Sequence, residues 1–271
     1  MDEPLVRLDL PGESGVATIT LDSPHNRNAL SRRLLSELAA ALDSAVEHPA
    51  TRVIVLTGAG PVFCSGADLK EQRASAGPGG ETVPGAPAAG VGGLPAILTR
   101  VWSCPQPVIC RLNGLARAGG VGLFSACDLV VAPTGVSFSF TEVRLGLVPA
   151  IITVPVLRRV AAQSVHRLFL TGEVIDAARA RDIGLVDEVA PAGELDAAVE
   201  RIVGMLLRGA PEALALTKQL ARTVATLSTQ EAFDRLAALS AERFASDEGR
   251  EGMLAFAEKR DPAWITATGR A

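Results

Sequence analysis

The sequence predicts an α/β fold, because short buried strands alternate with amphipathic helical stretches. Residues 52–58 (RVIVLTG), 107–114 (PVICRLNG) and 128–132 (DLVVA) are continuous apolar runs. Such runs are typical of parallel strands that are covered on both faces. Leucine and valine recur at helical spacing between residues 34 and 46. Ligands of α/β proteins bind where strands pass into helices, so those turns are where we expect a site.

The chain opens with two predicted strands, around residues 5–10 and 15–21, separated by the turn sequence PGESG. Ser31 then stands where it can cap the first helix. Residues 73–93 (RASAGPGGETVPGAPAAGVGG) follow later and are rich in glycine, alanine and proline. This composition is typical of a mobile lid and equally of a tolerated surface insertion. Both interpretations stay open.

The last part of the chain changes character, because glycine becomes sparse and helix signals replace strand signals. Pro211 suits a first helical position, and Ser228 with Glu231 forms a capping box. We therefore expect a core over residues 1–192 and a helical region over residues 193–271. That region either mediates oligomerisation or covers the core of its own chain.

Composition excludes several classes of protein. The net charge of -4 argues against a nucleic-acid surface built on positive potential. The three histidines lie far apart and no two of the four cysteines form a CxxC pair, so we predict no metal site and free thiols. The N-terminus lacks a secretory signal, and no apolar run reaches the ~18 residues of a membrane span. The expectation is a cytoplasmic protein that binds no membrane.

Two glycine-containing turns are the candidate sites: residues 58–71 (GAGPVFCSGADLKE) and 113–132 (NGLARAGGVGLFSACDLVVA). The first lacks G-x-G-x-x-G and the Lys-Ser/Thr pair of a P-loop. Each turn can instead present a backbone N–H group, and two such donors can hold a carbonyl oxygen that becomes negative. Gly119 and Gly120 each cost a helix about 0.5–1 kcal/mol. Close approach of a ligand and tight packing both explain that cost.

Several sequence blocks, in this order and spacing, resemble the enoyl-CoA hydratase/isomerase (crotonase) family. The resemblance spans nearly the whole chain. The blocks are RNALS (27–31), CSGADLKE (64–71), NGLARAGGVGLFSACDLVVA (113–132), FSFTEVRLGLVPA (138–150), LTGEVIDAARARDIGLVDEVAP (170–191) and FAEKRDPAW (256–264).

The resemblance implies a crotonase-like spiral of repeated ββα units, followed by a C-terminal helical region that trimerises. It implies a homotrimer or a dimer of trimers that binds an acyl thioester of coenzyme A and stabilises its enolate. No separate cofactor is implied, since coenzyme A is part of the substrate. The two donors of the oxyanion hole then fall on Ala67 and Gly119.

Glu142 is the catalytic acid/base that the resemblance implies. The sequence places Phe138, Phe140, Leu145 and Leu147 around it, and an apolar surrounding would raise its pKa towards a useful value. Its plain alternative is a surface glutamate paired with Arg144. The implied coenzyme A contacts are Arg27, Ala29, Ala67, Asp68, Leu69, Lys70, Gly119 and Lys259, the last from this or a neighbouring subunit.

The sequence departs from the family pattern at Gly122, where hydratases with two catalytic glutamates carry the second one. Asp68 is expected to cap a helix and does not replace it. Two reactions are open: hydration of a 2-enoyl-CoA by Glu142 alone, or Δ3,Δ2-isomerisation with Glu142 as the proton shuttle. The sequence is similar to the methylglutaconyl-CoA hydratase-like branch, which also has this glycine, and so favours hydration. A non-catalytic acyl-CoA-binding protein is the third hypothesis.

Overall fold

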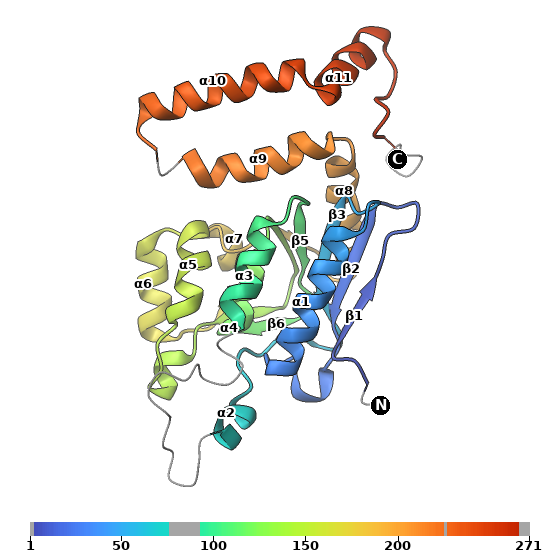
Figure 1. The fold of residues 1–271 in the computed structure, drawn as a ribbon. Helices are drawn as coiled ribbons and strands as arrows, with labels where there is room; N and C mark the ends of the chain where they lie inside the picture. The colour runs from blue at the N-terminus through green and yellow to red at the C-terminus, as the bar shows by residue number, and fades with distance from the viewer. Residues whose placement is uncertain (1–2, 76–92, 225–226, 266–271) are drawn as a thin grey trace.

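A six-stranded sheet forms the centre of the computed structural model, which describes residues 3–75, 93–224 and 227–265 (Figure 1). Its strand order is β1-β2-β3-β5-β7-β10. The β1–β2 pair is antiparallel and every other pair is parallel. The strands are β1 (Val6–Asp9), β2 (Val16–Leu21), β3 (Val53–Gly58), β5 (Val108–Arg111), β7 (Leu129–Pro133) and β10 (Glu188–Ala190).

Four short strands form a second sheet, and they alternate along the chain with strands of the large sheet. Its order is β4-β6-β8-β9, parallel except for the last pair. Each of β3, β5 and β7 is followed by one strand of the small sheet and then by helix, so the chain repeats a ββα unit. This confirms the predicted spiral of ββα units. The strands are β4 (Val62–Cys64), β6 (Leu115–Arg117), β8 (Ser137–Ser139) and β9 (Ile175–Asp176).

Helices cover one face of the large sheet and enclose the main core. The Ser31 side chain accepts a hydrogen bond from the Leu34 amide, as the capping pattern predicts. In the core, the Phe124 ring makes edge contacts with Phe63 and Phe138, at centroid distances of 6.4 and 5.4 Å. The helices that contribute to this core are α1 (Arg32–Glu47), α3 (Leu94–Ser103), α4 (Gly119–Ser125), α5 (Ala150–Arg159), α6 (Ala162–Thr171) and α7 (Ala177–Asp182). Helix α2 (Leu69–Ser75) lies below the sheets in Figure 1.

Helix α8 (Leu195–Leu207) packs against the large sheet, where Val199 and Ile202 join a smaller apolar cluster with Val53 and Val131. Helix α8 therefore contributes to the core of the molecule, although it lies inside the 193–271 region expected from the sequence. The division into residues 1–192 and 193–271 stays a prediction.

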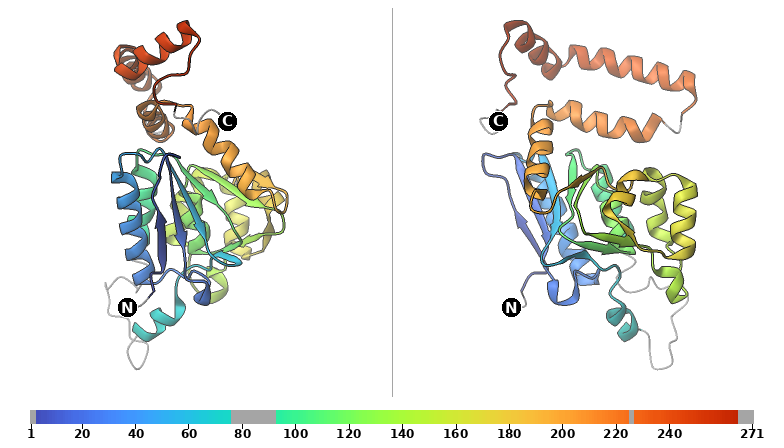
Figure 2. Two further views of the ribbon diagram at one scale, coloured as in Figure 1. Left: turned by 90° about the vertical axis from the view of Figure 1, so that its right-hand side faces the viewer. Right: turned by 180° about the vertical axis from the view of Figure 1, so that it is seen from behind.

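Helices α9 (Pro211–Thr223), α10 (Thr229–Ala245) and α11 (Asp247–Glu258) stand apart from the sheets (Figure 2). Ion pairs tie α9 to the core, because Lys218 Nζ lies 2.7 Å from Asp128 Oδ2 and Arg222 lies 3.0 Å from Asp128 Oδ1. The predicted capping box of Ser228 and Glu231 is present at the start of α10. Most of the glycine-rich segment 73–93 lies outside the described residues.

Candidate active site

The carboxyl ends of β2, β3 and β5 point to the lower end of the molecule in Figure 1, where helix α2 lies. A cavity of about 390 Å³ lies among the turns that follow these strands. Its walls bring together residues from the loop after β4, the start of α4, the 3₁₀ helix η2 (Glu142–Leu145) and the start of α5. This is where the α/β rule places a ligand.

The first candidate amide belongs to Ala67. Ala67 forms a parallel bridge with Leu30, in which the Leu30 amide donates to the Gly66 carbonyl at 2.8 Å and the Asp68 amide to the Leu30 carbonyl at 3.4 Å. Because successive amides alternate in direction along an extended chain, the Ala67 N–H points away from Leu30. It donates to no other described residue. Ala67 also lines the cavity.

The second candidate amide belongs to Gly119, the first residue of α4, which has no partner within its helix. Within the described residues this amide makes no hydrogen bond. The turns that carry the two amides touch: a Cβ atom on Gly66 would lie 3.3 Å from Gly119 N. Gly66 has φ +92, which glycine adopts without strain. The structure therefore brings both predicted oxyanion amides to one cavity.

The adjacent glycines Gly119 and Gly120 have different surroundings. A Cβ atom on Gly120 would lie 2.4 Å from the Cys64 carbonyl oxygen, so tight packing explains this glycine. Gly119 lines the cavity, and a Cβ atom there would lie 3.0 Å from Leu30 Cδ1. Ala118 before them has φ 46 and ψ −119, a conformation that is costly for a residue with a side chain.

Glu142 begins η2 and also lines the cavity. Its Oε2 atom is buried and has no hydrogen-bond partner among the described residues. Burial raises the pKa of this carboxyl, and a hydrogen bond from its own backbone opposes the rise in part. The alternative pairing with Arg144 does not form, since Arg144 donates to the Thr171 carbonyl at 3.2 Å.

The four apolar residues expected around Glu142 divide into two groups. Leu145 and Leu147 line the cavity beside it and are 57% and 49% exposed. Phe138 and Phe140 are buried in the core and do not line the cavity. Phe138 lies in β8 and Phe140 follows it two positions later, so both side chains point to the same face of the extended chain.

Gly122 has no room for a side chain. A Cβ atom on Gly122 would lie 2.2 Å from Ile152 Cγ2 and 2.7 Å from Ile152 Cβ. Glu142 is accordingly the one ionisable side chain among the described residues that line the cavity. The glycine at position 122 is visible in the sequence. The residue that occupies the space beside it is Ile152, which lies thirty positions further along the chain and which no sequence pattern singled out.

The predicted coenzyme A contacts lie mostly near the cavity mouth. Asp68 caps α2 as expected, because its Oδ1 accepts from the Lys70 and Glu71 amides at 3.0 and 3.1 Å. Leu69 lines the cavity. The Arg27 carbonyl accepts from the Ser65 amide at 3.1 Å, so the Arg27 backbone contacts the loop that carries Ala67.

One buried residue that holds these turns in place was not predicted. Asn28 is fully buried at φ 53, where it donates to the Ala59 and Val62 carbonyls at 3.1 and 2.8 Å and accepts from the Ser23 amide at 2.8 Å. The neighbouring Ala29 is also buried. These bonds join the turn after β2 to the turn after β3 and so position the cavity wall.

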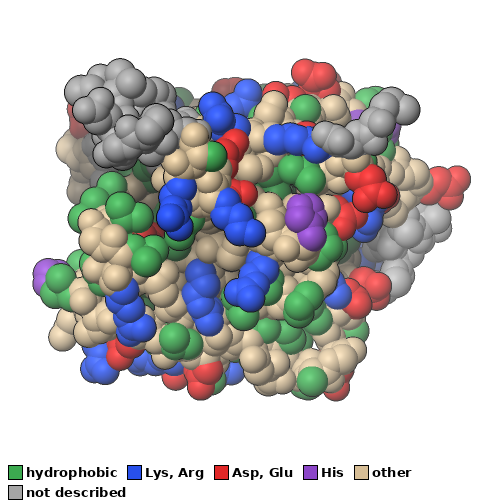
Figure 3. Space-filling view, turned by 90° about the horizontal axis from the view of Figure 1, so that it is seen from below, with side chains coloured by type: hydrophobic (Ala, Val, Ile, Leu, Met, Phe, Trp, Pro, Cys, Tyr) green, Lys and Arg blue, Asp and Glu red, His purple; other side chains and the backbone are tan. Residues whose placement is uncertain are grey.

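Lys259 is not brought to the site within one chain. It ends α11, at the upper end of the molecule in Figure 1, whereas the cavity and α2 lie at the lower end. The face seen from below carries Lys and Arg side chains gathered across its middle (Figure 3). A face of this charge suits a phosphorylated ligand.

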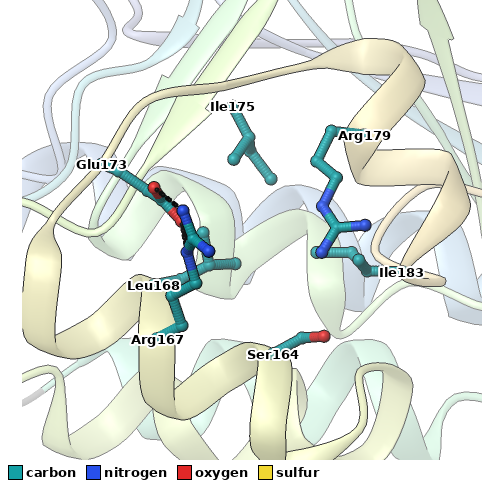
Figure 4. Close-up of a pocket in the computed structure, with 7 residues that line it drawn as sticks. All are labelled: Ser164, Arg167, Leu168, Glu173, Ile175, Arg179 and Ile183. Atoms are coloured by element: carbon teal, nitrogen blue, oxygen red, sulfur yellow. Dashed lines mark hydrogen bonds and ion pairs between the residues drawn. The ribbon is translucent and has the colours of Figure 1, made fainter.

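A second hollow, of about 260 Å³, lies between α6 and α7 (Figure 4). Its carboxylate, Glu173, accepts two hydrogen bonds from Arg167, at 2.7 and 3.1 Å. These bonds lower the pKa of Glu173, so this carboxylate is a charged partner and a poor base. The contrast with Glu142 favours the larger cavity as the active site. No cluster of metal-ligating side chains occurs in the described parts of the chain.

Comparison with known proteins agrees with the fold. The family model for enoyl-CoA hydratase/isomerase matches residues 12–267. The solved structure of an enoyl-CoA hydratase from Mycobacterium avium is 41% identical, with a TM-score of 0.71, and covers 97% of this chain and 100% of that chain. An enoyl-CoA hydratase from Mycobacterium smegmatis is 31% identical, with a TM-score of 0.89 and the same coverage. Carnitinyl-CoA dehydratase of Escherichia coli K12 is 32% identical over 265 residues, 95% of this chain and 97% of its own.

The repeated ββα units define a crotonase-type protein, a class that acts on acyl-CoA thioesters. More particularly, the chain belongs to the enoyl-CoA hydratase/isomerase family. The four cysteines are free and buried, as the sequence predicted. Among the described residues, no helix combines the length and apolar character needed to cross a membrane.

Proposed function

We propose that the protein is an enoyl-CoA hydratase that adds water across the 2,3 double bond of a 2-enoyl-CoA. The Ala67 and Gly119 amides bind the thioester oxygen, and Glu142 is the single acid/base. The observation that carries this proposal is one cavity that contains two unpartnered main-chain amides and one carboxyl of raised pKa. The family membership supports it.

The proposed reaction needs one proton-transfer group. The Glu142 carboxylate removes a proton from water as the oxygen bonds to C3, and the π electrons move to the thioester oxygen. The two amides stabilise the resulting enolate, and losing one such donor costs about 2.7–4 kcal/mol of transition-state stabilisation. The protonated Glu142 then returns the proton to C2, which regenerates the carboxylate and yields 3-hydroxyacyl-CoA.

Δ3,Δ2-Isomerisation is the second candidate, and a glycine in place of a second carboxyl at position 122 favours it. With Ile152 in the space beside that glycine, Glu142 is the one carboxyl of the described cavity lining, which is sufficient to move a proton between C2 and C4. Incubation of crotonyl-CoA and a 3-enoyl-CoA in oxygen-18 water separates the two reactions. Hydration incorporates the isotope into the product, whereas turnover without incorporation would establish isomerisation.

A non-catalytic acyl-CoA-binding protein is distinguished by a different measurement. Binding of crotonyl-CoA by the wild-type protein, with no turnover of either ester, would establish this function and contradict both reactions. The Glu142 Oε2 atom argues for catalysis, because a buried carboxyl oxygen without a hydrogen-bond partner is costly and binding alone gives it no role.

We further propose that the protein is a homotrimer or a dimer of trimers, assembled through α9–α11. Phe233, Phe244 and Phe256 on these helices are 69%, 66% and 86% exposed in a single chain. Such apolar exposure is typical of an interface. In the proposed assembly, Lys259 binds the coenzyme A phosphates of a neighbouring subunit. Sedimentation equilibrium gives the mass, and a monomer at micromolar concentration would contradict the proposal.

A further inference from the structure

The contact between Gly122 and Ile152 bears on which acyl groups the cavity accepts. Gly122 lies within α4, and Ile152 lies in the first turn of α5 with 3% of its surface exposed. The Ile152 side chain occupies the space into which any side chain at position 122 would extend. The two positions are therefore coupled, since a larger residue at one requires a smaller residue at the other.

Ile152 is also part of the cavity wall, together with other aliphatic residues. On the side of η2 and α5 these include Leu147, Val148 and Ile151, and on the other side Leu30 and Leu94. Among the described residues that line the cavity, none is basic, none is aromatic and only Glu142 is acidic. The uncharged polar side chains of the lining are Ser65, Gln72 and Thr141. A terminal carboxylate on the acyl chain would therefore meet no cation in the described wall and would share the cavity with the Glu142 carboxyl, which is unfavourable.

We propose that Ile152 is a specificity-determining residue: seated over Gly122, it forms an apolar wall that admits small, uncharged aliphatic acyl groups. Acyl groups with a terminal carboxylate are rejected, because no cation of the described wall meets them. The inference rests on the proposed function. By this inference the protein does not act on a dicarboxylic acyl group, although it shares the glycine at position 122 with the methylglutaconyl-CoA hydratase-like branch.

Turnover of four esters tests the role of Ile152: crotonyl-CoA, 3-methylcrotonyl-CoA, 2-octenoyl-CoA and glutaconyl-CoA. For the wild type we expect kcat/KM for crotonyl-CoA to exceed that for glutaconyl-CoA by about 100-fold or more, since an unpaired buried charge opposes binding. Ile152→Ala is expected to raise the ratio of 3-methylcrotonyl-CoA to crotonyl-CoA about 10-fold, the effect of one or two methylene groups in an apolar pocket. Ile152→Val, which preserves the packing best, is expected to change this ratio in the same direction by a smaller factor.

The matched control is Val154→Ala, also on α5, because Val154 is 51% exposed and does not line the cavity. It is expected to leave all four relative rates unchanged. Relative rates in both Ile152 variants that equal those of the wild type would overturn the proposal. Preference of the wild type for glutaconyl-CoA would overturn it as well.

A double variant tests the coupling without requiring turnover. Gly122→Ala is expected to lower the melting temperature and weaken butyryl-CoA binding, and adding Ile152→Gly is expected to restore part of both. A Gly122→Ala protein with wild-type stability and binding would contradict the coupling. The ratio of butyryl-CoA to glutaryl-CoA affinity, measured by calorimetry, tests the selectivity even if no ester is turned over. Absence of all turnover would contradict the proposed function, and equal affinities for these two esters would contradict the inference.

Discussion

The Lys218 ammonium lies 2.7 Å from Asp128 Oδ2 and joins the C-terminal helices to the strand region of the core. Its side chain is only 5% exposed, and it also donates to the carbonyls of Val101 and Gln106 at 3.0 and 2.9 Å. The ammonium group of a lysine on α9 thus lies among groups of the α3–β5 connection and Asp128. Buried charges of this kind are stable only when fully partnered.

Removing the ammonium should destabilise the protein. Lys218→Met leaves Asp128 with Arg222 as its remaining cation and leaves two carbonyls without this donor. An unsatisfied buried group of this kind costs about 1–3 kcal/mol. Denaturation in urea measures the loss. Arg181→Met is the control, because its 3.5 Å contact with Asp182 is exposed on both sides and contributes about 0–1 kcal/mol. Equal midpoints for the two variants would show that the Lys218 pair is dispensable.

Glu142→Gln should remove catalysis and keep binding. General acid–base groups contribute about 10²–10⁴-fold to the rate, so kcat with crotonyl-CoA should fall by at least 100-fold. The affinity for butyryl-CoA, measured by calorimetry, should change little because the amide keeps the shape of the side chain. A variant that retains more than half of the wild-type kcat would exclude Glu142 as the acid/base.

The rate should also depend on the protonation of Glu142. Water activation needs the carboxylate, and burial places its pKa above the ordinary value of 4.5. As the pH rises through that raised pKa, kcat/KM should increase tenfold per pH unit on the acidic limb and then level off. A pH profile of crotonyl-CoA turnover checks this, and a limb that levels off below pH 4.5 would show that burial does not control the group.

The same pKa shift predicts a pH-dependent stability. Because the folded-state pKa of Glu142 is raised, its stabilising contribution is complete below the unfolded pKa and is lost as the pH rises through the folded value. Glu142→Gln should therefore raise the melting temperature more at pH 8 than at pH 4. Glu173→Gln should show the opposite sign, because Arg167 lowers the Glu173 pKa and the contribution of that carboxylate is lost as the pH falls. Parallel shifts at both pH values would contradict this argument.

Ala118→Gly should stabilise the fold. Ala118 is held at φ 46 and ψ −119, a conformation with a cost of order 1–3 kcal/mol that glycine does not bear. After the greater backbone entropy of glycine in the unfolded chain is subtracted, the gain should be about 1 kcal/mol. Ala178→Gly, at an exposed position inside α7, should instead destabilise by about 0.5–1 kcal/mol. Thermal unfolding of both variants tests the contrast.

The sequence predicted the elements that depend on local chemistry. The buried runs became β3, β5 and β7, Ser31 and Ser228 became helix caps, and Pro211 begins α9. These features are set by side chains a few residues apart, so a linear pattern contains them. The ββα spiral required the family resemblance, because no local pattern specifies which strands of the two sheets pair.

The cavity shows where sequence reasoning reached its limit. Ala67, Gly119 and Glu142 were named, and the structure brings them to one cavity. Ile152 and Asn28 were missed, since their roles depend on contacts with residues about thirty positions away. Whether Phe138 faces the core or the cavity also depends on how its strand is oriented relative to the other layers, which no run of letters specifies.

The two turns that carry Ala67 and Gly119 belong to successive ββα units, and Gly66 packs directly on the second turn. Neither unit contains both donors, so an incompletely folded chain that has formed only the first unit has no oxyanion hole. Regain of activity after dilution from denaturant therefore reports the docking of two successive units. It should follow, and never precede, the return of far-ultraviolet circular dichroism.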